Sequence, residues 1–320
     1  MTCELGKGDL DMATASLHHF GVTAQAGIFA VGASEHGYVE FDLLPGKEPA
    51  ELVASLAALQ GPGSPLAGVG TVVGFKPELW SAVAPGQSPP GARSFDAVTG
   101  PEISMPATQH DAWLWVAGVS RSAVFDAVSA AVGHVAGTAC VASEINGWVY
   151  QTNRDLTGFV DGTENPSPLE AHRVAVTGGD SAAAGASVVL YQKWVHLDSF
   201  SALSAAAQEK VIGRTKADSV ELDEAEMPAD SHVARNVIEV NGEELAIYRR
   251  NTSYGSPSEH GTLFVGFCSS IAPLQTMLES MAGVRDGIRD ALTRHTAALS
   301  GAYYVIPSVP SLSHFVRFDD

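Results

Sequence analysis

The chain has 320 residues, of which 45% are hydrophobic and 17% are charged. This composition can fill the core of one large domain or two ordinary ones, and it excludes a disordered chain. The formal net charge of −18 repels phosphate backbones and anionic lipids, so neither nucleic acid nor a membrane is an expected partner.

Hydrophobic periodicity predicts alternating strands and helices in the first half of the chain. In chain order these are a strand over 26–31, a helix over 49–59, strands over 69–75 and 112–119, a helix over 121–135 and a strand over 140–150. Allowing for one strand whose position is unclear, this order is the β-α-β-β-α-β pattern of a ferredoxin-like module.

The second half repeats the plan more loosely. Strands are predicted over 187–197, 263–268 and 302–306, and helices over 199–212, 273–281 and 286–299. Two long polar connections, 155–186 and 213–261, lie between these elements, and connections of that length in a compact domain usually carry function. We therefore expect two modules, residues 1–145 and 146–320.

Cysteine usage and the N-terminus bear on the cellular compartment. Cys3, Cys140 and Cys268 form no CxxC pair, and an odd number of scattered thiols is typical of a reducing compartment. The N-terminus has no basic segment followed by an apolar one, and no run of about 18 apolar residues occurs. These features predict a cytoplasmic protein without a transmembrane helix.

The run GFVDGTENP at 158–166 is the densest turn sequence in the chain. Its Asp-Gly and Asn-Pro pairs mark turns, and two carboxylates, Asp161 and Glu164, stand three residues apart. Taken alone, the run is most simply a surface loop with solvated acids. A cation site is the next interpretation, although the regular acidic spacing of a calcium loop is absent.

Two further runs follow it. The first, 230–236, contains His232, and a lone histidine is usually a hydrogen-bonded structural residue rather than a ligand. The second, 248–255, contains Arg249, Arg250 and Asn251. A solvated basic pair would explain the two arginines equally well.

Taken together and in this order, the three runs resemble those of dye-decolourising haem peroxidases, and GFVDGTENP fits the GxxDGT signature of that family. The compact length and the N-terminus are most similar to the bacterial B-type group. The resemblance implies an α+β fold of two ferredoxin-like modules, of the dimeric α+β barrel type, with antiparallel sheets and helices outside. It also implies that haem b (iron protoporphyrin IX) binds in the C-terminal module.

The resemblance assigns three residues to the cofactor. His232 matches the proximal histidine that binds the iron, and Arg214 matches an arginine beside a haem propionate. Asp286 matches the carboxylate that accepts a hydrogen bond from the proximal histidine. Asp290 lies one turn later in the predicted helix, so the sequence leaves the choice between these two acids open.

Three catalytic residues follow from the same resemblance. Asp161 matches a distal aspartate that moves the peroxide proton, Arg249 a distal arginine that stabilises negative charge, and Asn251 a distal asparagine that orients peroxide. The side chain of Arg250 is expected to point elsewhere.

The implied reaction consumes H2O2 and an organic reductant, oxidising bulky dyes and phenols through a ferryl intermediate. The alternatives are a haem-handling protein that stores or delivers haem with little turnover, and a regulatory module without haem. A homo-oligomer, either a dimer or a hexamer, is also expected from the resemblance.

Overall fold

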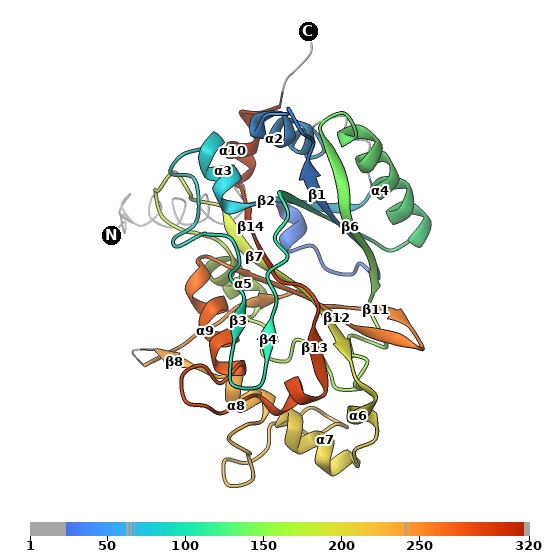
Figure 1. Ribbon diagram of the computed structural model, residues 1–320, viewed down its shortest axis with the longest axis vertical. Helices are drawn as coiled ribbons and strands as arrows, with labels where there is room; N and C mark the ends of the chain where they lie inside the picture. Colours follow the sequence, from blue (N-terminus) through green and yellow to red (C-terminus); the bar gives the residue numbers. More distant parts are fainter. Residues whose placement is uncertain (1–23, 62–63, 65, 67, 241, 317–320) are drawn as a thin grey trace, which may run out of the picture.

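The structure is a computed structural model that describes residues 24–61, 64, 66, 68–240 and 242–316 (Figure 1). Cys3 and the N-terminal segment, on which the predicted compartment partly depends, lie outside these residues. Cys140 and Cys268 are free thiols. Within the described ranges, no helix is long and apolar enough to cross a membrane.

Four strands form the sheet of the first module. They are β1 (Glu35–Leu43), β2 (Gly70–Phe75), β5 (Ala112–Gly118) and β6 (Ala139–Trp148). Their spatial order is β6-β1-β5-β2, with every pairing antiparallel. Helix α2 (Pro49–Ala58) connects β1 to the strand β2, and α4 (Arg121–Val135) connects β5 to β6. This is the ferredoxin-like module that the sequence predicts.

The second module has the same strand order. Its strands are β7 (Ser187–His196), β11 (Thr252–Ser256), β12 (Glu259–Cys268) and β14 (Ala302–Ile306), arranged as β14-β7-β12-β11. The short strand β10 (Tyr248–Arg249) pairs with β12 in the same register as β11, so the two are one strand interrupted at residues 250 and 251.

Strand β13 (Thr296–Ala298) extends this sheet by pairing with β7. The other elements of this half are α5 (Pro168–Ala175), α6 (Asp198–Ser201), α7 (Ala205–Ile212), α8 (His232–Asn236), the paired strands β8 (Glu239–Val240) and β9 (Glu243–Glu244), α9 (Ile271–Met281), η2 (Ala291–Arg294) and α10 (Val309–Ser313). Helices α8 and α9 lie together in the lower half of the molecule in Figure 1.

The two modules join edge to edge. Strand β2 pairs with β14, β6 pairs with β11, and the additional pairing of β12 with β7 closes the sheet into a barrel of antiparallel strands. Side chains alternate across each strand, so the barrel has an inner and an outer face. On β5, for example, Trp113 and Trp115 pack inside the barrel, whereas Leu114 and Val116 pack outside it against the helices of the first module. The α+β fold with helices outside is confirmed.

Three predicted elements differ from the structure. Residues 26–31 do not form a strand, since η1 (Ala26–Ile28) is a 3-10 helix there, and the strand of this region is β1. The helix predicted over 199–212 is divided into α6 and α7, because Ser204 caps a new helix through the Ala207 N–H. The helix predicted over 286–299 is wrong: that segment contains η2 and β13, and Gly287 has a left-handed φ of 77°.

Candidate active site

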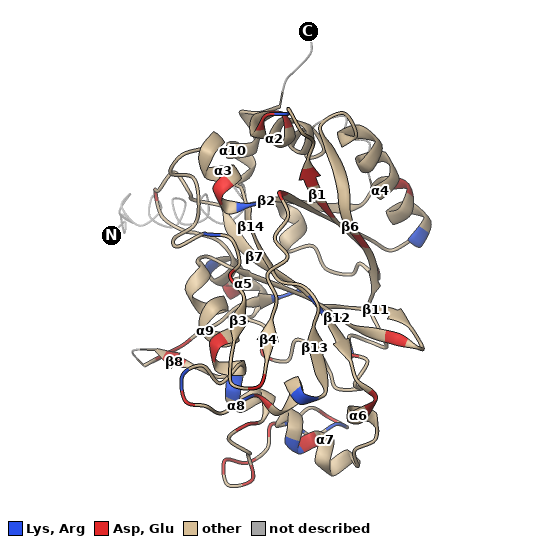
Figure 2. Ribbon diagram, in the orientation of Figure 1, with Lys and Arg blue, Asp and Glu red and all other residues tan. Residues whose placement is uncertain are grey.

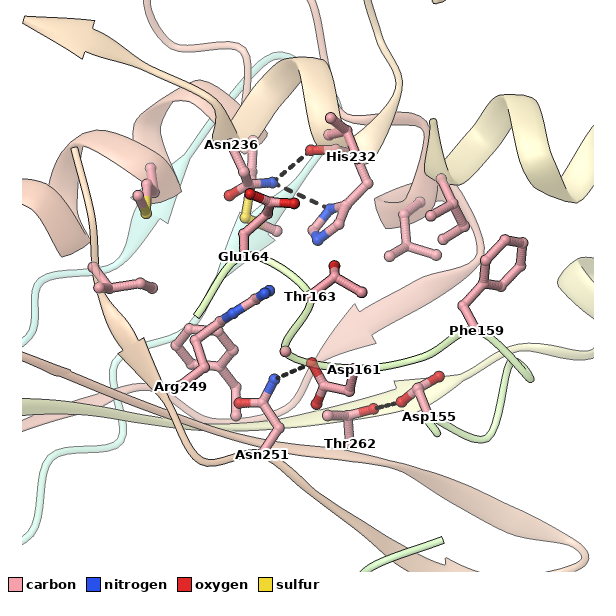
Figure 3. A pocket seen from close by; sticks show the side chains of 18 of the residues that line it. Asp155, Phe159, Asp161, Thr163, Glu164, His232, Asn236, Arg249, Asn251 and Thr262 are labelled. Atoms are coloured by element: carbon pink, nitrogen blue, oxygen red, sulfur yellow. Dashed lines mark hydrogen bonds between the residues drawn. The ribbon is translucent and has the colours of Figure 1, made fainter. Parts of the chain in front are cut away.

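A pocket lies on the outer face of the second module's sheet, which α8 and α9 cover. Its walls are mainly apolar and include Leu190, Ile212, Phe264, Leu274, Met277 and Leu278. The polar residues predicted from the sequence line the same pocket, with the exception of Asp286: they are Asp161, Arg214, His232, Arg249 and Asn251. Figure 3 shows His232 on one side of the pocket and Asp161 with Asn251 on the other.

The loop that carries Asp161 is fixed through its backbone. Asn153 binds Asp161 from both sides, because its carbonyl accepts from the Asp161 N–H and its Nδ2 donates to the Asp161 carbonyl, both at 2.9 Å. Gly162 follows with φ 75°, a left-handed conformation that glycine adopts without steric cost. The turn residues of GFVDGTENP therefore fix the Asp161 carboxylate at the pocket, which Glu164 of the same motif also lines.

Asn165 of the same motif connects this loop to the strand that carries the arginines. Its Nδ2 donates to the Arg249 carbonyl and its Oδ1 accepts from the Arg249 N–H, each at 2.9 Å. The Asn165 side chain thus satisfies the backbone N–H and carbonyl of Arg249, as a neighbouring strand would. From the sequence this asparagine is predicted only as a turn residue, and its position inside the motif is the signal that points to a role at the site.

Strand alternation separates the two neighbouring arginines. Arg249 and Asn251 face the pocket, while Arg250 points into the barrel, donates to the carbonyls of Ile28 and Ala30, and lies over the ring of Trp115. The expectation that Arg250 points elsewhere is confirmed. In the described part of the chain, the Arg249 guanidinium makes no hydrogen bond or ion pair, so its charge is available to a group in the pocket.

Asn251 is held between the strand and the loop. Its Oδ1 accepts from the Val265 N–H at 3.1 Å, which interrupts the ladder between β10 and β11. Its Nδ2 lies 3.4 Å from Asp161 Oδ1, a long hydrogen bond. The amide and the carboxylate therefore present adjacent polar atoms to the pocket.

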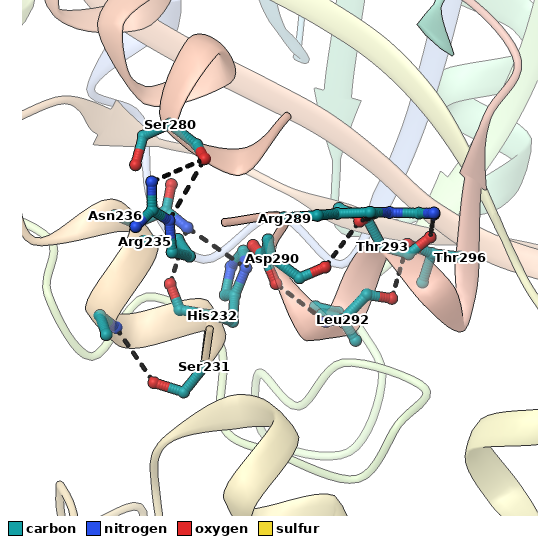
Figure 4. A network of polar contacts seen from close by, with 11 residues as sticks. Ser231, His232, Arg235, Asn236, Ser280, Arg289, Asp290, Leu292, Thr293 and Thr296 are labelled. Atoms are coloured by element: carbon teal, nitrogen blue, oxygen red, sulfur yellow. Dashed lines mark hydrogen bonds and ion pairs between the residues drawn. The ribbon is translucent and has the colours of Figure 1, made fainter. Parts of the chain in front are cut away.

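His232 stands at the first residue of α8, and its partner is a buried acid. Its Nδ1 lies 2.7 Å from Asp290 Oδ2, and the Asp290 side chain is fully buried (Figure 4). An imidazole that donates through Nδ1 keeps its lone pair on Nε2, which is the arrangement of a metal-binding histidine. Asn236 adds a contact of 3.2 Å between its Nδ2 and the same ring nitrogen.

Asp286, the acid that the resemblance assigned to His232, belongs to another ion pair. Both of its oxygens accept from Arg235, at 2.9 and 3.1 Å, and it does not line the pocket. The hydrogen bond from the Ile288 N–H, followed by that from the Arg235 side chain, holds the pKa of Asp286 below its usual value. The structure therefore places Asp290 on His232. The reason is local: residues 286–290 are not helical, and Asp290 instead caps η2 through the Leu292 N–H.

Arg214 lines the pocket with its guanidinium already in use. It donates to Glu164, to Glu221 at 2.8 Å and to the Ser219 carbonyl at 2.9 Å. The two carboxylates of this cluster more than balance the single positive charge.

The chemistry of the pocket suits a large, mostly apolar group that carries a metal. His232 directs Nδ1 to Asp290 and leaves Nε2 for a metal. Apolar walls surround it, and opposite it stand a carboxylate and an arginine whose guanidinium has no partner among the described residues. Gln192 is buried in the wall, and its Nε2 has no hydrogen-bond partner among the described residues. A buried donor without a partner is costly, so an occupant with an acceptor fits this position.

Comparison with protein families gives two matches. Residues 35–149 match the model of the Dyp-type peroxidase N-terminal domain, and residues 152–311 match that of the C-terminal domain. The dye-decolorizing peroxidase of Rhodococcus erythropolis is 34% identical over 287 residues, which cover 86% of this chain and 84% of that protein. The dye-decolorizing peroxidase of Mycobacterium tuberculosis is 33% identical over 268 residues, which cover 82% of this chain and 80% of that protein.

Solved structures agree with these matches. DypB from Rhodococcus jostii RHA1 has a TM-score of 0.84 at 30% identity, covering 90% of this chain and 97% of that one. The dye-decolorizing protein from Vibrio cholerae has a TM-score of 0.82 at 35% identity, covering 91% and 99%. Variants of the Rhodococcus DypB were solved in complex with heme. On its sequence and its fold, the chain belongs to the Dyp-type peroxidase family.

Proposed function

We propose that this peroxidase uses haem b to reduce H2O2 and to oxidise bulky organic donors such as dyes and phenols. The observation that carries the proposal is the arrangement around the pocket. His232, with its Nδ1 on buried Asp290, faces a space whose other side presents Asp161, Arg249 and Asn251.

His232 would hold the iron through Nε2, and Asp290 would keep the ring in the tautomer that binds metal. Gln192 and the apolar walls would enclose the macrocycle. Arg214 would donate a hydrogen bond to a haem carboxylate, which would replace one of the carboxylates that Arg214 contacts now, Glu164 or Glu221. When bound, haem supplies the redox centre that takes up the two oxidising equivalents of peroxide.

The residues opposite His232 would handle protons and charge. Asp161 would accept a proton from one peroxide oxygen and return it to the other. Arg249 would stabilise the negative charge that develops on the departing oxygen, since its guanidinium has no competing partner in the described chain. Asn251 would orient the peroxide beside the Asp161 carboxylate.

Steady-state oxidation of an anthraquinone dye by the haem-loaded protein tests this function. We expect turnover that requires both H2O2 and haem. A protein that binds haem stoichiometrically but oxidises neither dyes nor phenols over pH 4–7 would instead be a haem-storage or haem-delivery protein.

The proposal includes a cytoplasmic homo-oligomer, a dimer or a hexamer. The scattered thiols support the compartment, and the resemblance supports the assembly. Cell fractionation measures the compartment, and light scattering of the purified protein measures the oligomeric state.

A further inference from the structure

A second polar group lines the pocket and has no part in the function proposed so far. It consists of Asp155, Thr262 and His196, which come from the loop after β6, from β12 and from the end of β7. Figure 3 shows Asp155 and Thr262 on the same side of the pocket as Asp161. None of the three was singled out by the sequence.

The hydrogen bonds within this group have a defined direction. The Thr262 hydroxyl lies 2.5 Å from Asp155 Oδ2 and 2.9 Å from His196 Nε2. The carboxylate can only accept, so the hydroxyl donates its single proton to Asp155 and accepts from the His196 Nε2–H. The result is a chain from His196 through Thr262 to Asp155.

This chain of hydrogen bonds ends at Asp155 on the pocket side and is in contact with His260 on the other side. Asp155 Oδ1 also accepts from the Thr157 N–H at 2.8 Å, which fixes the carboxylate while it faces the pocket. At the other end, the ring of His260 meets that of His196 edge to face, with 5.9 Å between centroids, and His260 is half-exposed on β12. The path therefore runs from the protein surface to the pocket.

The charged and titratable groups that face His196 are Asp155 and His260, while β13 presents the uncharged Thr296 opposite it. Burial lowers the pKa of His196, His260 lowers it further, and Asp155 raises it in part. The ring is therefore mostly neutral near pH 7 and can receive a proton on one nitrogen while it releases one from the other.

The overall reaction needs such a path. Reduction of H2O2 to two molecules of water consumes two electrons and two protons. A donor that gives up only electrons supplies no protons, and a bulky donor that releases its proton to bulk solvent does not deliver it to the pocket. Two protons must therefore cross from solvent to the pocket in each turnover.

We propose that His260, His196, Thr262 and Asp155 form a proton relay that delivers these protons to the pocket beside Asp161. Protons move along the two existing hydrogen bonds, from His196 to Thr262 and from Thr262 to Asp155. The half-exposed His260 exchanges protons with solvent beside the His196 ring, and the two electrons come from two molecules of donor. The inference rests on the proposed peroxidase function. In it, Asp161 moves a proton from one peroxide oxygen to the other, and the relay supplies the protons that come from solvent.

The experiment uses the haem-loaded protein, one equivalent of H2O2 and ABTS, a donor that loses an electron without a proton. We compare Thr262→Val, which removes the hydroxyl, with Thr262→Ser, which keeps it. Thr177→Val is the matched control, because it removes a hydroxyl that donates to the Ser269 carbonyl and lies outside both the pocket and the relay. Stopped-flow absorbance follows the return to the resting spectrum in H2O and D2O.

We expect Thr262→Val to slow the return by at least about tenfold, since positioned proton transfer typically contributes about 10²–10⁴-fold. Its solvent isotope effect should differ from that of the wild type, and Thr262→Ser should restore the rate to within about twofold. If Thr262→Val folds poorly by circular dichroism, Asp155→Asn replaces it, because the amide keeps an acceptor but cannot carry the proton. Wild-type return rates in the folded variant would overturn the relay.

A second readout does not depend on turnover. In the haem-free protein, 15N resonances of the His196 ring report which nitrogen carries the proton. We expect Nε2–H in the wild type and in Thr262→Ser, and redistribution to Nδ1 in Thr262→Val; an unchanged tautomer in Thr262→Val would contradict the assigned hydrogen-bond direction. A wild type that does not react with H2O2 would defeat the proposed function, whereas an active wild type with an unaffected Thr262→Val defeats the relay alone.

Discussion

The Asp290 side chain accepts two hydrogen bonds from different partners. One oxygen accepts from His232 and the other caps η2 through the Leu292 N–H at 2.8 Å, and the side chain has no exposed surface. The second contact fixes the carboxylate so that it cannot turn away from the imidazole. A charge held in this way raises the basicity of a histidine that binds a metal.

Replacing Asp290 with Asn should therefore lower haem affinity or kcat/KM for peroxide about 10–100-fold, which is typical for loss of an anionic partner behind a ligating histidine. Haem titration and peroxide kinetics measure the two effects. Asp286→Asn is the matched comparison, because it removes an acid four residues earlier that binds Arg235. Equal losses in both variants would contradict the assignment of Asp290.

Arg249 and Arg250 differ in what their side chains contact. Arg249→Leu removes from the pocket a charge that has no partner among the described residues, so the rate of reaction with H2O2 should fall about 10²–10³-fold, as when a donor to a developing oxyanion is lost. Arg250→Leu removes donors to two carbonyls inside the barrel and should lower Tm with a smaller effect on that rate. Stopped-flow mixing and thermal unfolding distinguish the two, and a reversed pattern would refute the assignment.

At the scale of elements, the site depends on a link between a loop and a strand. Asn165 holds Arg249 by two backbone hydrogen bonds, so the GFVDGTENP loop and β10 move as one unit. Asn165→Ala leaves an N–H and a carbonyl of Arg249 without these partners.

We expect Asn165→Ala to slow the reaction with H2O2 while haem binding through His232 persists, because the change displaces Arg249 and not α8. The loss of the two hydrogen bonds should also cost about 1–3 kcal/mol in the free energy of unfolding. Urea unfolding and stopped-flow rates test both, with Asn146→Ala on β6 as a control distant from the motif. An unchanged peroxide rate would show that the link does not position Arg249.

The elements that the sequence failed to predict share a cause. The sequence predicts residues 248–256 as part of a polar connection because the residues of this strand that face the pocket, Arg249 and Asn251, are polar and break the hydrophobic alternation of a core strand. Strand β1 was missed for a similar reason, since His36 and Glu40 occupy buried positions on it. The resemblance assigned Asp286, with Asp290 open as the alternative one turn later in a predicted helix; Gly287 and the η2 cap prevent that helix, and the structure places Asp290 on His232. Motif order identified the remaining pocket residues, which share no local pattern.

At the scale of the whole molecule, the barrel joins segments far apart in the chain, such as β6 with β11 and β2 with β14. Such pairings leave no trace in local periodicity, so the resemblance to a family, rather than the pattern, predicted this architecture. The acidic residues are spread over both modules (Figure 2), which is consistent with a role in solubility rather than with one docking surface.

The closed barrel also buries titratable groups, and His36 is one of them. Burial and the charge of Arg250 lower the pKa of His36 from 6.5 to about 4. Because the folded state binds this proton less readily than the unfolded state, stability falls as the pH falls from 6.5 towards 4. The loss amounts to about 3 kcal/mol in the free energy of unfolding.

His36→Gln, which keeps an acceptor for the Trp115 Nε1–H, should reduce the loss of stability between pH 6.5 and 4. Glu40 is buried nearby with a raised pKa, but it is common to both proteins, so the difference between them isolates His36. Urea unfolding at pH 7, 6, 5 and 4 measures it, with the exposed His134→Gln as a control. Identical pH dependence in wild type and His36→Gln would contradict the role of His36.

The central claim is that His232 binds haem iron opposite Asp161 and Arg249. The absorption spectrum of the haem-loaded protein, before and after one equivalent of H2O2, tests it most directly in wild type and His232→Ala. We predict a Soret band in the wild type that changes rapidly with H2O2, and in His232→Ala a lost or shifted band that added imidazole restores. A His232→Ala protein with the wild-type ferric spectrum and the wild-type response to peroxide would contradict the account.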